Sequence, residues 1–221
     1  MINIAQYIDH TVLKPTCTSL DIKKLCNEAI KHRFAAVCVP PNFVAYAAKL
    51  TYDTGVKVAT VVGFPFGYST TAAKIAEIEQ AIKDGANEID LVHNISAVKE
   101  ENWDLLAEEI TACLKPIRLH NKCIKVIIES SILTDGEIIK SCELYAKHKV
   151  DFVKTSTGYA EGGASIYAVN LMREHLPESI QIKASGGIKN YKAAKELVAA
   201  GATRIGASAG VAIVNEEAKL A

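Results

Sequence analysis

Eight short runs rich in β-branched and aliphatic residues alternate with helix-like segments along this chain, and no other feature restricts its fold as much. The alternation matches a compact α/β fold, the (β/α)8 or TIM barrel, near the low end of its size range. No low-complexity or Pro/Gly/Ser-rich linker interrupts it, so we predict a single barrel domain over residues 1–221. The predicted strands are Tyr7–Thr11, Ala35–Val39, Lys57–Gly63, Glu88–His93, Ile124–Ser130, Val150–Thr155, Ile180–Ser185 and Thr203–Ser208.

The segments between the strands carry helix start and stop signals. Capping boxes are predicted at Thr18 with Asp21 and at Thr134 with Glu137, and the Gly-Ala pairs at 85–86 and 201–202 end helices just before strands. The alternative fold is an open doubly wound sheet, which would follow if the weak first strand did not form. No G-x-G-x-x-G or P-loop pattern follows any predicted strand, which argues against a nucleotide-binding form of that alternative.

Composition narrows the possible partners. The chain is 49% hydrophobic and 23% charged, as in ordinary soluble proteins, with 25 Lys plus Arg against 25 Asp plus Glu. This balance predicts no binding to nucleic acid or a membrane, so any anion site must be local. With no positive leader and no C-x-x-C pair, we expect a reduced, cytoplasmic protein. The histidines lack H-x-x-x-H or HExxH spacing, so we expect no metal and no cofactor, and a structural role for His10.

Charged residues occupy strand positions that should face the barrel axis. Alternation places Lys183 and Asp90 on the inner faces of their strands, because the flanking isoleucine and leucine residues face the helices. Alternation alone leaves the direction of Lys154 open; we place it inside because among the helices it would be buried without a partner. The three side chains then lie toward the C-terminal ends of their strands, where barrel enzymes keep their catalytic groups.

Such an arrangement suits amine chemistry. Desolvation and a second positive charge both lower the pKa of a lysine, which frees one amine to act as a nucleophile near neutral pH. Asp90 would balance the other lysine and share its protons. A structural ion pair is the competing interpretation of the three residues. Lys125 and Glu129 share one face of their strand, where a part in the same network and a separate salt bridge fit equally well.

The last two predicted strands end in glycine-rich sequences. In Ser185–Gly187 and Gly206–Gly210 glycine lets the backbone approach a ligand, and successive N–H groups in such turns bind anions. Loops after the seventh and eighth strands are the usual phosphate site of this fold, and residues 155–158 add hydroxyl groups nearby. Arg204 and Lys189 lie near these loops and are expected to be solvated surface charges.

Several phrases of the sequence resemble those of deoxyribose-phosphate aldolases, a class I, Schiff-base aldolase family. The specific signal is K-T-S-T-G at 154–158 together with K-A-S-G-G at 183–187. E-I-D-L-V at 88–92, I-D-H-T at 8–11 and L-K-P at 13–15 agree with it, in an ordered match that covers nearly the whole chain.

The resemblance implies a role for each matched residue. Lys154 would form the Schiff base with the donor carbonyl, Lys183 would lower its pKa and transfer protons, and Asp90 would relay protons through water. The implied reaction is reversible cleavage of 2-deoxy-D-ribose 5-phosphate to D-glyceraldehyde 3-phosphate and acetaldehyde, in deoxyribonucleoside and carbohydrate catabolism. Relatives are often homodimers or homotetramers, which implies a homo-oligomer. The phosphate site would comprise Gly158, Gly186, Gly187, Gly206 and Ser208, with Thr11, Asp9 and Lys14 near the substrate hydroxyls.

The sequence also departs from the family pattern. Ala209 stands where relatives often have a second serine, which predicts slightly weaker phosphate binding, and His93 replaces the usual aliphatic residue. The chain stops at Ala221 without the aromatic tail of many relatives, which predicts slower or less selective catalysis. Two rival functions are a transaldolase-like Schiff-base barrel with a different donor and a non-catalytic barrel that binds sugar phosphates.

Overall fold

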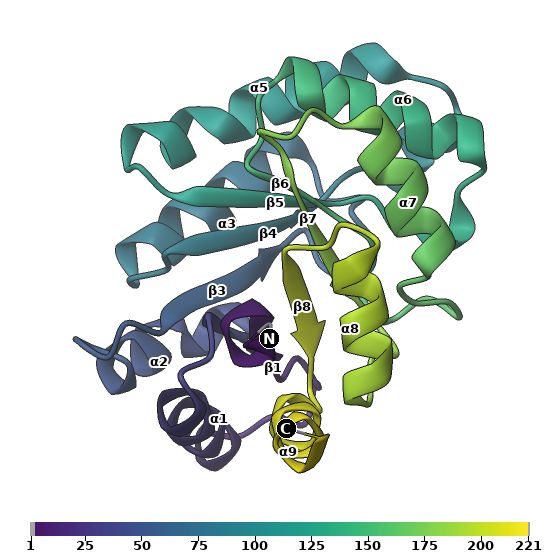
Figure 1. The fold of residues 1–221 in the computed structure, drawn as a ribbon. Helices are drawn as coiled ribbons and strands as arrows, with labels where there is room; N and C mark the ends of the chain where they lie inside the picture. The colour runs from purple at the N-terminus through teal and green to yellow at the C-terminus, as the bar shows by residue number, and fades with distance from the viewer. Residues whose placement is uncertain (1–2, 221) are drawn as a thin grey trace.

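Eight parallel strands form a closed barrel around which the rest of the chain is wound (Figure 1). The computed structural model describes residues 3–220. β1 pairs with β2 on one side and with β8 on the other, so the weak first strand closes the barrel and the alternative of an open sheet is wrong. The strands are β1 Ile8–Thr11, β2 Ala36–Val39, β3 Lys57–Val62, β4 Glu88–Val92, β5 Cys123–Ile127, β6 Phe152–Lys154, β7 Gln181–Ser185 and β8 Arg204–Ala207. The predicted (β/α)8 barrel is confirmed.

Helices cover the outer face of the barrel. Both predicted capping boxes form, at the starts of α1 and α6, and Gly85 and Gly201 follow α3 and α8 with positive φ angles of 103° and 115°. The α-helices are α1 Ser19–His32, α2 Val44–Leu50, α3 Thr71–Lys83, α4 Ile95–Lys99, α5 Trp103–Leu119, α6 Asp135–Lys147, α7 Ile166–His175, α8 Tyr191–Ala199 and α9 Gly210–Leu220. Short 3-10 helices are η1 Ile4–Tyr7, η2 Pro41–Phe43 and η3 Ser130–Ile132.

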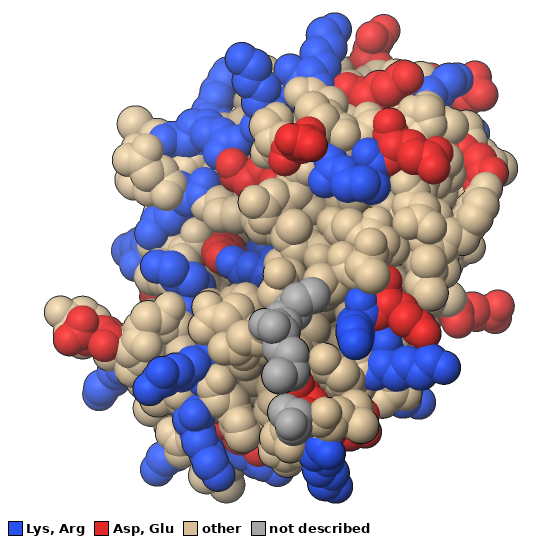
Figure 2. All heavy atoms as spheres, viewed as in Figure 1, with Lys and Arg blue, Asp and Glu red and all other residues tan. Residues whose placement is uncertain are grey.

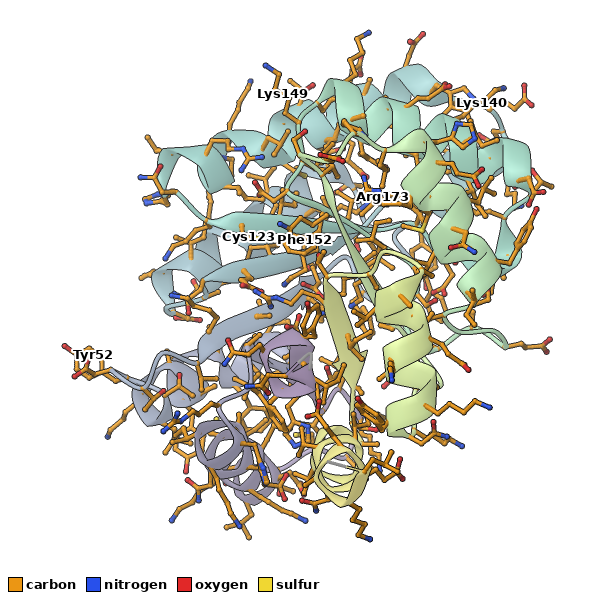
Figure 3. All side chains as sticks on the ribbon, viewed as in Figure 1. Tyr52, Cys123, Lys140, Lys149, Phe152 and Arg173 are labelled. Atoms are coloured by element: carbon orange, nitrogen blue, oxygen red, sulfur yellow. The ribbon has the colours of Figure 1, made fainter. Side chains whose placement is uncertain are left out.

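The two faces of the strands bury different kinds of side chain. Outward-facing residues such as Leu91 and Ile182 pack in one large apolar core between the strands and the helices. The barrel interior instead holds charged side chains, which belong to the site described below. Cys123 and Phe152 lie near the middle of the barrel in the view of Figure 3, and the guanidinium carbon of Arg204 lies 5.7 Å from the centre of the Phe152 ring. The barrel therefore positions ionic groups, beside a small separate apolar cluster of Cys38, Ala59 and Val61.

Buried hydrogen bonds of His93 link the C-terminal ends of β4 and β5 to α6. The Nε2 atom of His93 lies 3.1 Å from the carbonyl oxygen of Ile128, and its Nδ1 atom lies 3.1 Å from the hydroxyl of Tyr145. Burial lowers the pKa of His93 to about 3, so the ring is neutral. It therefore donates from Nε2 to Ile128 and accepts from Tyr145 at Nδ1. This explains how a polar residue fits at a position where the sequence pattern favours an aliphatic one.

The outer surface mixes charges of both signs, and the ends of the described chain meet. Lys and Arg side chains alternate with Asp and Glu over the face shown in Figure 2, as the equal numbers of the two classes predict. The backbone N–H of Ile4 donates to Glu217 on α9 at 3.2 Å. Among residues 3–220, no helix combines the length and the apolar character needed to cross a bilayer.

Candidate active site

One carboxylate inside the barrel, that of Asp90, contacts three amines. Lys154 Nζ and Lys183 Nζ each lie 2.8 Å from Asp90 Oδ2, and Lys125 Nζ lies 2.8 Å from Asp90 Oδ1. None of the four side chains is more than 3% exposed. The register explains the meeting, because Asp90 lies opposite Lys125 on β5, and Lys154 lies opposite Lys183 on β7. Lys154 therefore faces inward, as the sequence analysis proposed.

Two further carboxylates complete the ionic cluster below this group. Asp9 Oδ2 lies 2.5 Å from Lys183 Nζ, and Asp9 Oδ1 lies 2.5 Å from a guanidinium nitrogen of Arg204. Glu88 bridges Arg204 at 2.8 Å and Lys125 at 2.6 Å. With Asp90, the cluster thus contains three carboxylates that match the charges of Lys125, Lys183 and Arg204. A protonated Lys154 would be a fourth cation without its own counter-charge.

The direction of each pKa shift follows from this imbalance. Burial lowers the pKa of Lys154, Asp90 opposes the change and Lys183 adds to it, with a net pKa below the ordinary lysine value. Burial acts the same way on Lys183, but Asp9 and Asp90 outweigh it and raise its pKa. Burial favours the neutral form of Asp90, yet the pKa of this carboxyl is held well below its usual range by Lys125, Lys154 and Lys183. Lys154 is therefore the amine that loses its proton first.

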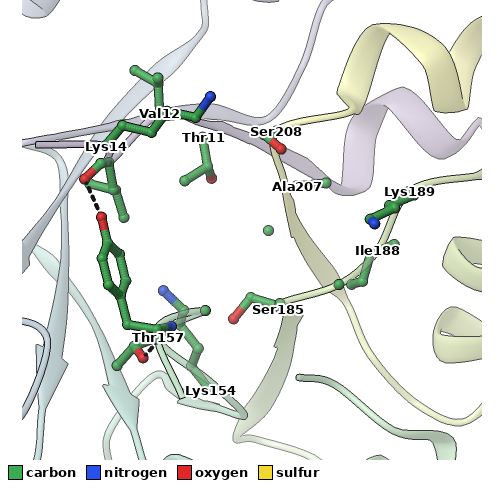
Figure 4. Close-up of a pocket in the computed structure, with 16 residues that line it drawn as sticks. Thr11, Val12, Lys14, Lys154, Thr157, Ser185, Ile188, Lys189, Ala207 and Ser208 are labelled. Carbon is green, nitrogen blue, oxygen red and sulfur yellow. Dashed lines mark hydrogen bonds between the residues drawn. The ribbon is translucent and has the colours of Figure 1, made fainter. Parts of the chain in front are cut away.

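A pocket of about 320 Å³ opens above Lys154 at the C-terminal ends of the strands (Figure 4). Its wall comes from the loops after β1, β6, β7 and β8, so strands from both ends of the chain contribute. This volume suits a small metabolite. The lining residues used below are Thr11, Leu13, Lys14, Lys154, Thr157, Gly158, Tyr159, Gly186, Gly187, Lys189, Gly206 and Ser208.

Glycine is required at two places in this wall for different reasons. A Cβ atom on Gly206 would lie 2.8 Å from Cβ of Ser185 and 3.1 Å from Cε of Lys183, so a side chain there would displace the lysine. Gly187 has open space around it but a φ angle of 77°, which L side chains rarely adopt. The backbone of these loops can thus approach a ligand closely, and exposed N–H groups there suit an anion.

Most of the residues singled out in the sequence meet in this pocket. The structure brings together Lys154, Gly158, Gly186, Gly187, Gly206, Ser208, Thr11 and Lys14 along its wall. Asp90 and Lys183 lie directly beneath Lys154. Asp9 is the exception, because it is fully buried in the ionic cluster and pairs with Lys183 and Arg204 instead of lining the pocket. His10 contacts Glu28 at 2.8 Å, outside the pocket wall.

The charges outside the main trio are only partly as predicted. Arg204 is not a solvated surface charge, since it begins β8 and binds Asp9 and Glu88 with 16% of its side chain exposed. Lys189 lines the pocket. Lys125 joins the network, whereas Glu129 accepts hydrogen bonds from the backbone N–H and the hydroxyl of Thr157. Inward alternation was the available signal for Glu88 and Lys125, and the hydroxyl-rich segment 155–158 was the signal for Thr157, although its contact with Glu129 leaves no pattern in the sequence.

Comparison with known proteins gives one consistent result. Residues 3–216 match the family described as DeoC/LacD family aldolase. Deoxyribose-phosphate aldolases from Caldanaerobacter subterraneus subsp. tengcongensis and Caldicellulosiruptor saccharolyticus are 49% and 50% identical to this chain. The first alignment covers 98% of this chain and 94% of the relative, and the second covers 97% and 98%.

Solved structures agree with the sequence matches. A protein described as QR15, an aldolase, is 37% identical, with a TM-score of 0.94 over 99% of this chain and 97% of its own. The deoxyribose phosphate aldolase of Aeropyrum pernix, described as a unique tetramer, is 29% identical, with a TM-score of 0.92 over 99% of this chain and 92% of its own. With the lysine–carboxylate cluster in place beneath the pocket, these matches show that the chain belongs to the DeoC/LacD family of aldolases.

Proposed function

We propose that this protein reversibly cleaves 2-deoxy-D-ribose 5-phosphate to D-glyceraldehyde 3-phosphate and acetaldehyde, through a Schiff base on Lys154. The observation that carries the proposal is the ionic cluster, in which three carboxylates match three other cations and leave Lys154 as the amine of lowered pKa. A passive binding barrel would gain little from an amine of lowered pKa beneath its pocket. The names of the relatives support the choice of substrate.

The first chemical step joins the substrate to the amine. The neutral Nζ of Lys154 adds to the C1 carbonyl of the open-chain sugar, and loss of water leaves a protonated imine. Lys183 and Asp90 lie close enough to supply and remove the protons of this step, because Asp90 Oδ2 is 2.8 Å from both amines. A water molecule between Asp90 and the substrate would extend this relay.

The cleavage step uses the imine as an electron sink. Loss of the proton from the C3 hydroxyl lets the C2–C3 bonding electrons move toward the imine, which forms an enamine and releases glyceraldehyde 3-phosphate. Protonation of the enamine at C2 and addition of water then release acetaldehyde and restore Lys154. Aldol addition runs through the same steps in reverse.

The pocket wall supplies binding energy away from the reacting carbons. The glycine-rich loops at Gly186, Gly187 and Gly206, with Ser208, would hold the phosphate, and Lys14 and Lys189 add positive charge to the same pocket. Anchoring the phosphate fixes the position of C1 relative to Lys154, which lowers the entropic part of the barrier. We place this activity in deoxyribonucleoside breakdown in the cytoplasm, in a homodimer or homotetramer that binds neither nucleic acid nor membrane.

Covalent trapping tests the proposal directly. The protein is incubated with acetaldehyde and sodium borohydride, and its peptides are analysed by mass spectrometry. We expect one reduced two-carbon adduct, on Lys154, and none on the Lys154→Met variant. An adduct with no turnover of acetaldehyde as donor would point to the transaldolase-like alternative. Folded protein that is stabilised by sugar phosphate but forms no adduct would show a non-catalytic binding barrel.

A further inference from the structure

Tyr159 stands at the edge of the pocket, directly after Gly158 in the loop that follows β6. The residue is 48% exposed, and its ring packs edge to face against Phe64, from the loop after β3, with ring centres 5.4 Å apart and an interplanar angle of 88°. Phe64 thus supports the ring from a part of the barrel that does not line the pocket. Neither Tyr159 nor Phe64 takes part in the steps of the proposed reaction.

Hydrogen bonds fix the orientation of the Tyr159 ring at both ends. Its hydroxyl donates to the carbonyl of Leu13, in the loop after β1, at 2.8 Å, and its backbone N–H donates to the hydroxyl of Thr157 at 3.0 Å. Thr157 is itself held by buried Glu129, which accepts from the Thr157 backbone N–H at 3.1 Å and from its hydroxyl. The ring therefore joins the loops after β6 and β1 as a fixed wall.

Figure 4 shows which side of the pocket this wall occupies. The dashed lines that mark the two Tyr159 hydrogen bonds lie beside Lys14 and Thr157, across the opening from Ser185, Ile188 and Lys189. The glycine-rich loops for the phosphate lie on the latter side. Lys154 lies beside Thr157 at the lower edge of the view and also lines the pocket.

Because of the geometry of the imine, the position of Tyr159 can affect which carbonyl compounds serve as donor. The imine carbon carries the Lys154 nitrogen, C2 of the sugar and one further substituent. If the phosphate occupies the glycine-rich loops, as the proposed function requires, C2 extends toward those loops. The further substituent then points to the opposite side, toward Tyr159. It is a hydrogen atom when the donor is an aldehyde and a carbon group when the donor is a ketone.

We propose that Tyr159 determines donor specificity, by filling the space that a ketone's second carbon group would occupy. The inference rests on the proposed function, which has an aldehyde donor, and adds to it the residue that excludes a ketone donor. One methyl group that must be accommodated or excluded changes selectivity by roughly 10- to 200-fold. The ring carries this selectivity, whereas its hydroxyl only holds the ring and the loop after β1 in place.

A competition experiment tests the assignment. Wild type, Tyr159→Ala, Tyr159→Leu and Tyr159→Phe are each incubated with acetone and acetaldehyde together and reduced with borohydride, and the three-carbon and two-carbon adducts on Lys154 are counted. The acetone-to-acetaldehyde ratio should rise at least about 10-fold in Tyr159→Ala, rise less in Tyr159→Leu and stay near wild type in Tyr159→Phe. Tyr52→Ala is the control, since Tyr52 is 84% exposed and projects away from the barrel (Figure 3).

The outcomes separate this inference from the proposed function. An unchanged ratio in both Tyr159→Ala and Tyr159→Leu, with acetaldehyde still trapped on Lys154, would overturn the role of Tyr159 and leave the aldolase activity standing. An equal rise in Tyr52→Ala would also overturn it. Wild type that traps no acetaldehyde would overturn both. If alanine unfolds the chain, circular dichroism will show it, and the Tyr159→Leu ratio decides the question alone.

Discussion

At the scale of single residues, the pKa values of three buried lysines depend on how many carboxylates each of them contacts. Lys125 and Lys183 each reach two or more acidic groups, and burial is outweighed for both, so their pKa values rise. Among residues 3–220, Asp90 is the one acidic group within ion-pair distance of Lys154, and the pKa of Lys154 falls. The pKa values of lysines in the same barrel thus shift in opposite directions, because the amines contact different numbers of carboxylates.

Removing Lys183 should raise the pKa of Lys154. In Lys183→Leu, one positive charge near Lys154 is lost and Asp90 interacts more strongly with Lys154, so both effects favour the protonated amine. We expect kcat to fall at least about 100-fold, with the loss of a proton-transfer group contributing. The pH at which borohydride trapping of Lys154 reaches its midpoint should move upward.

Binding of inorganic phosphate, followed by calorimetry, should remain detectable in Lys183→Leu, since the glycine-rich loops are unchanged. Lys192→Leu is the matched control because this lysine lies on α8 with 86% of its side chain exposed. Near-normal turnover in Lys183→Leu would contradict the role assigned to Lys183.

At the scale of elements, the sequence predicts features that follow a periodic pattern, such as strands and their inner faces. It does not predict contacts that depend on the conformation of the loops. The period of two within strands was sufficient to place Asp90 and Lys183 inside, and the strand–helix alternation was sufficient for the barrel. Alternation does not predict which inward-facing side chains lie at the same height along the barrel axis, however. The binding of Arg204 to Asp9 and Glu88 was therefore missed. Tyr159 was missed because its position is set by the hydrogen bonds that it donates to Thr157 and Leu13, and neither bond leaves a periodic signal in the sequence.

His93 offers a test of how β4, β5 and α6 are joined. His93→Leu should lower the free energy of unfolding by about 1–3 kcal/mol, because the hydroxyl of Tyr145 is left buried without its acceptor. Adding Tyr145→Phe removes that hydroxyl and should restore part of the loss. Urea unfolding of the wild type, both single variants and the double variant measures the coupling. Costs that simply add would show that the two side chains do not interact.

At the scale of the whole molecule, the ionic cluster makes stability depend on acid. Burial raises the pKa of Asp9, but Lys183, Lys125 and Arg204 together hold it well below the unfolded value of 3.8. A depressed carboxyl pKa means that Asp9 stabilises the fold above pH 3.8 and that this contribution is lost as the pH falls from there toward the folded-state pKa.

Asp9→Asn should therefore be less stable than wild type at pH 7, by about 3–5 kcal/mol, because it leaves buried cations without their partner. Below pH 3.8 the difference should narrow by up to about 1.4 kcal/mol per pH unit, because Asp9 takes up a proton in unfolded wild type while it stays ionised in the folded protein. Urea unfolding at a series of pH values provides the measurement. A difference that stays constant from neutral to acid pH would show that folding does not lower the pKa of Asp9.

The seam between β1 and β8 also has a consequence for how the protein comes into being. Asp9 on β1 finds its guanidinium partner on β8, and the pocket takes wall residues from the loops after both strands. The ribosome synthesises the chain from its N-terminal end, so a nascent chain that still lacks residues 204–208 lacks the guanidinium partner of Asp9 and part of the pocket wall. Residues 204–208 must therefore be synthesised before the pocket and the ionic cluster can be complete, and a messenger broken before that point would yield a chain without the whole site.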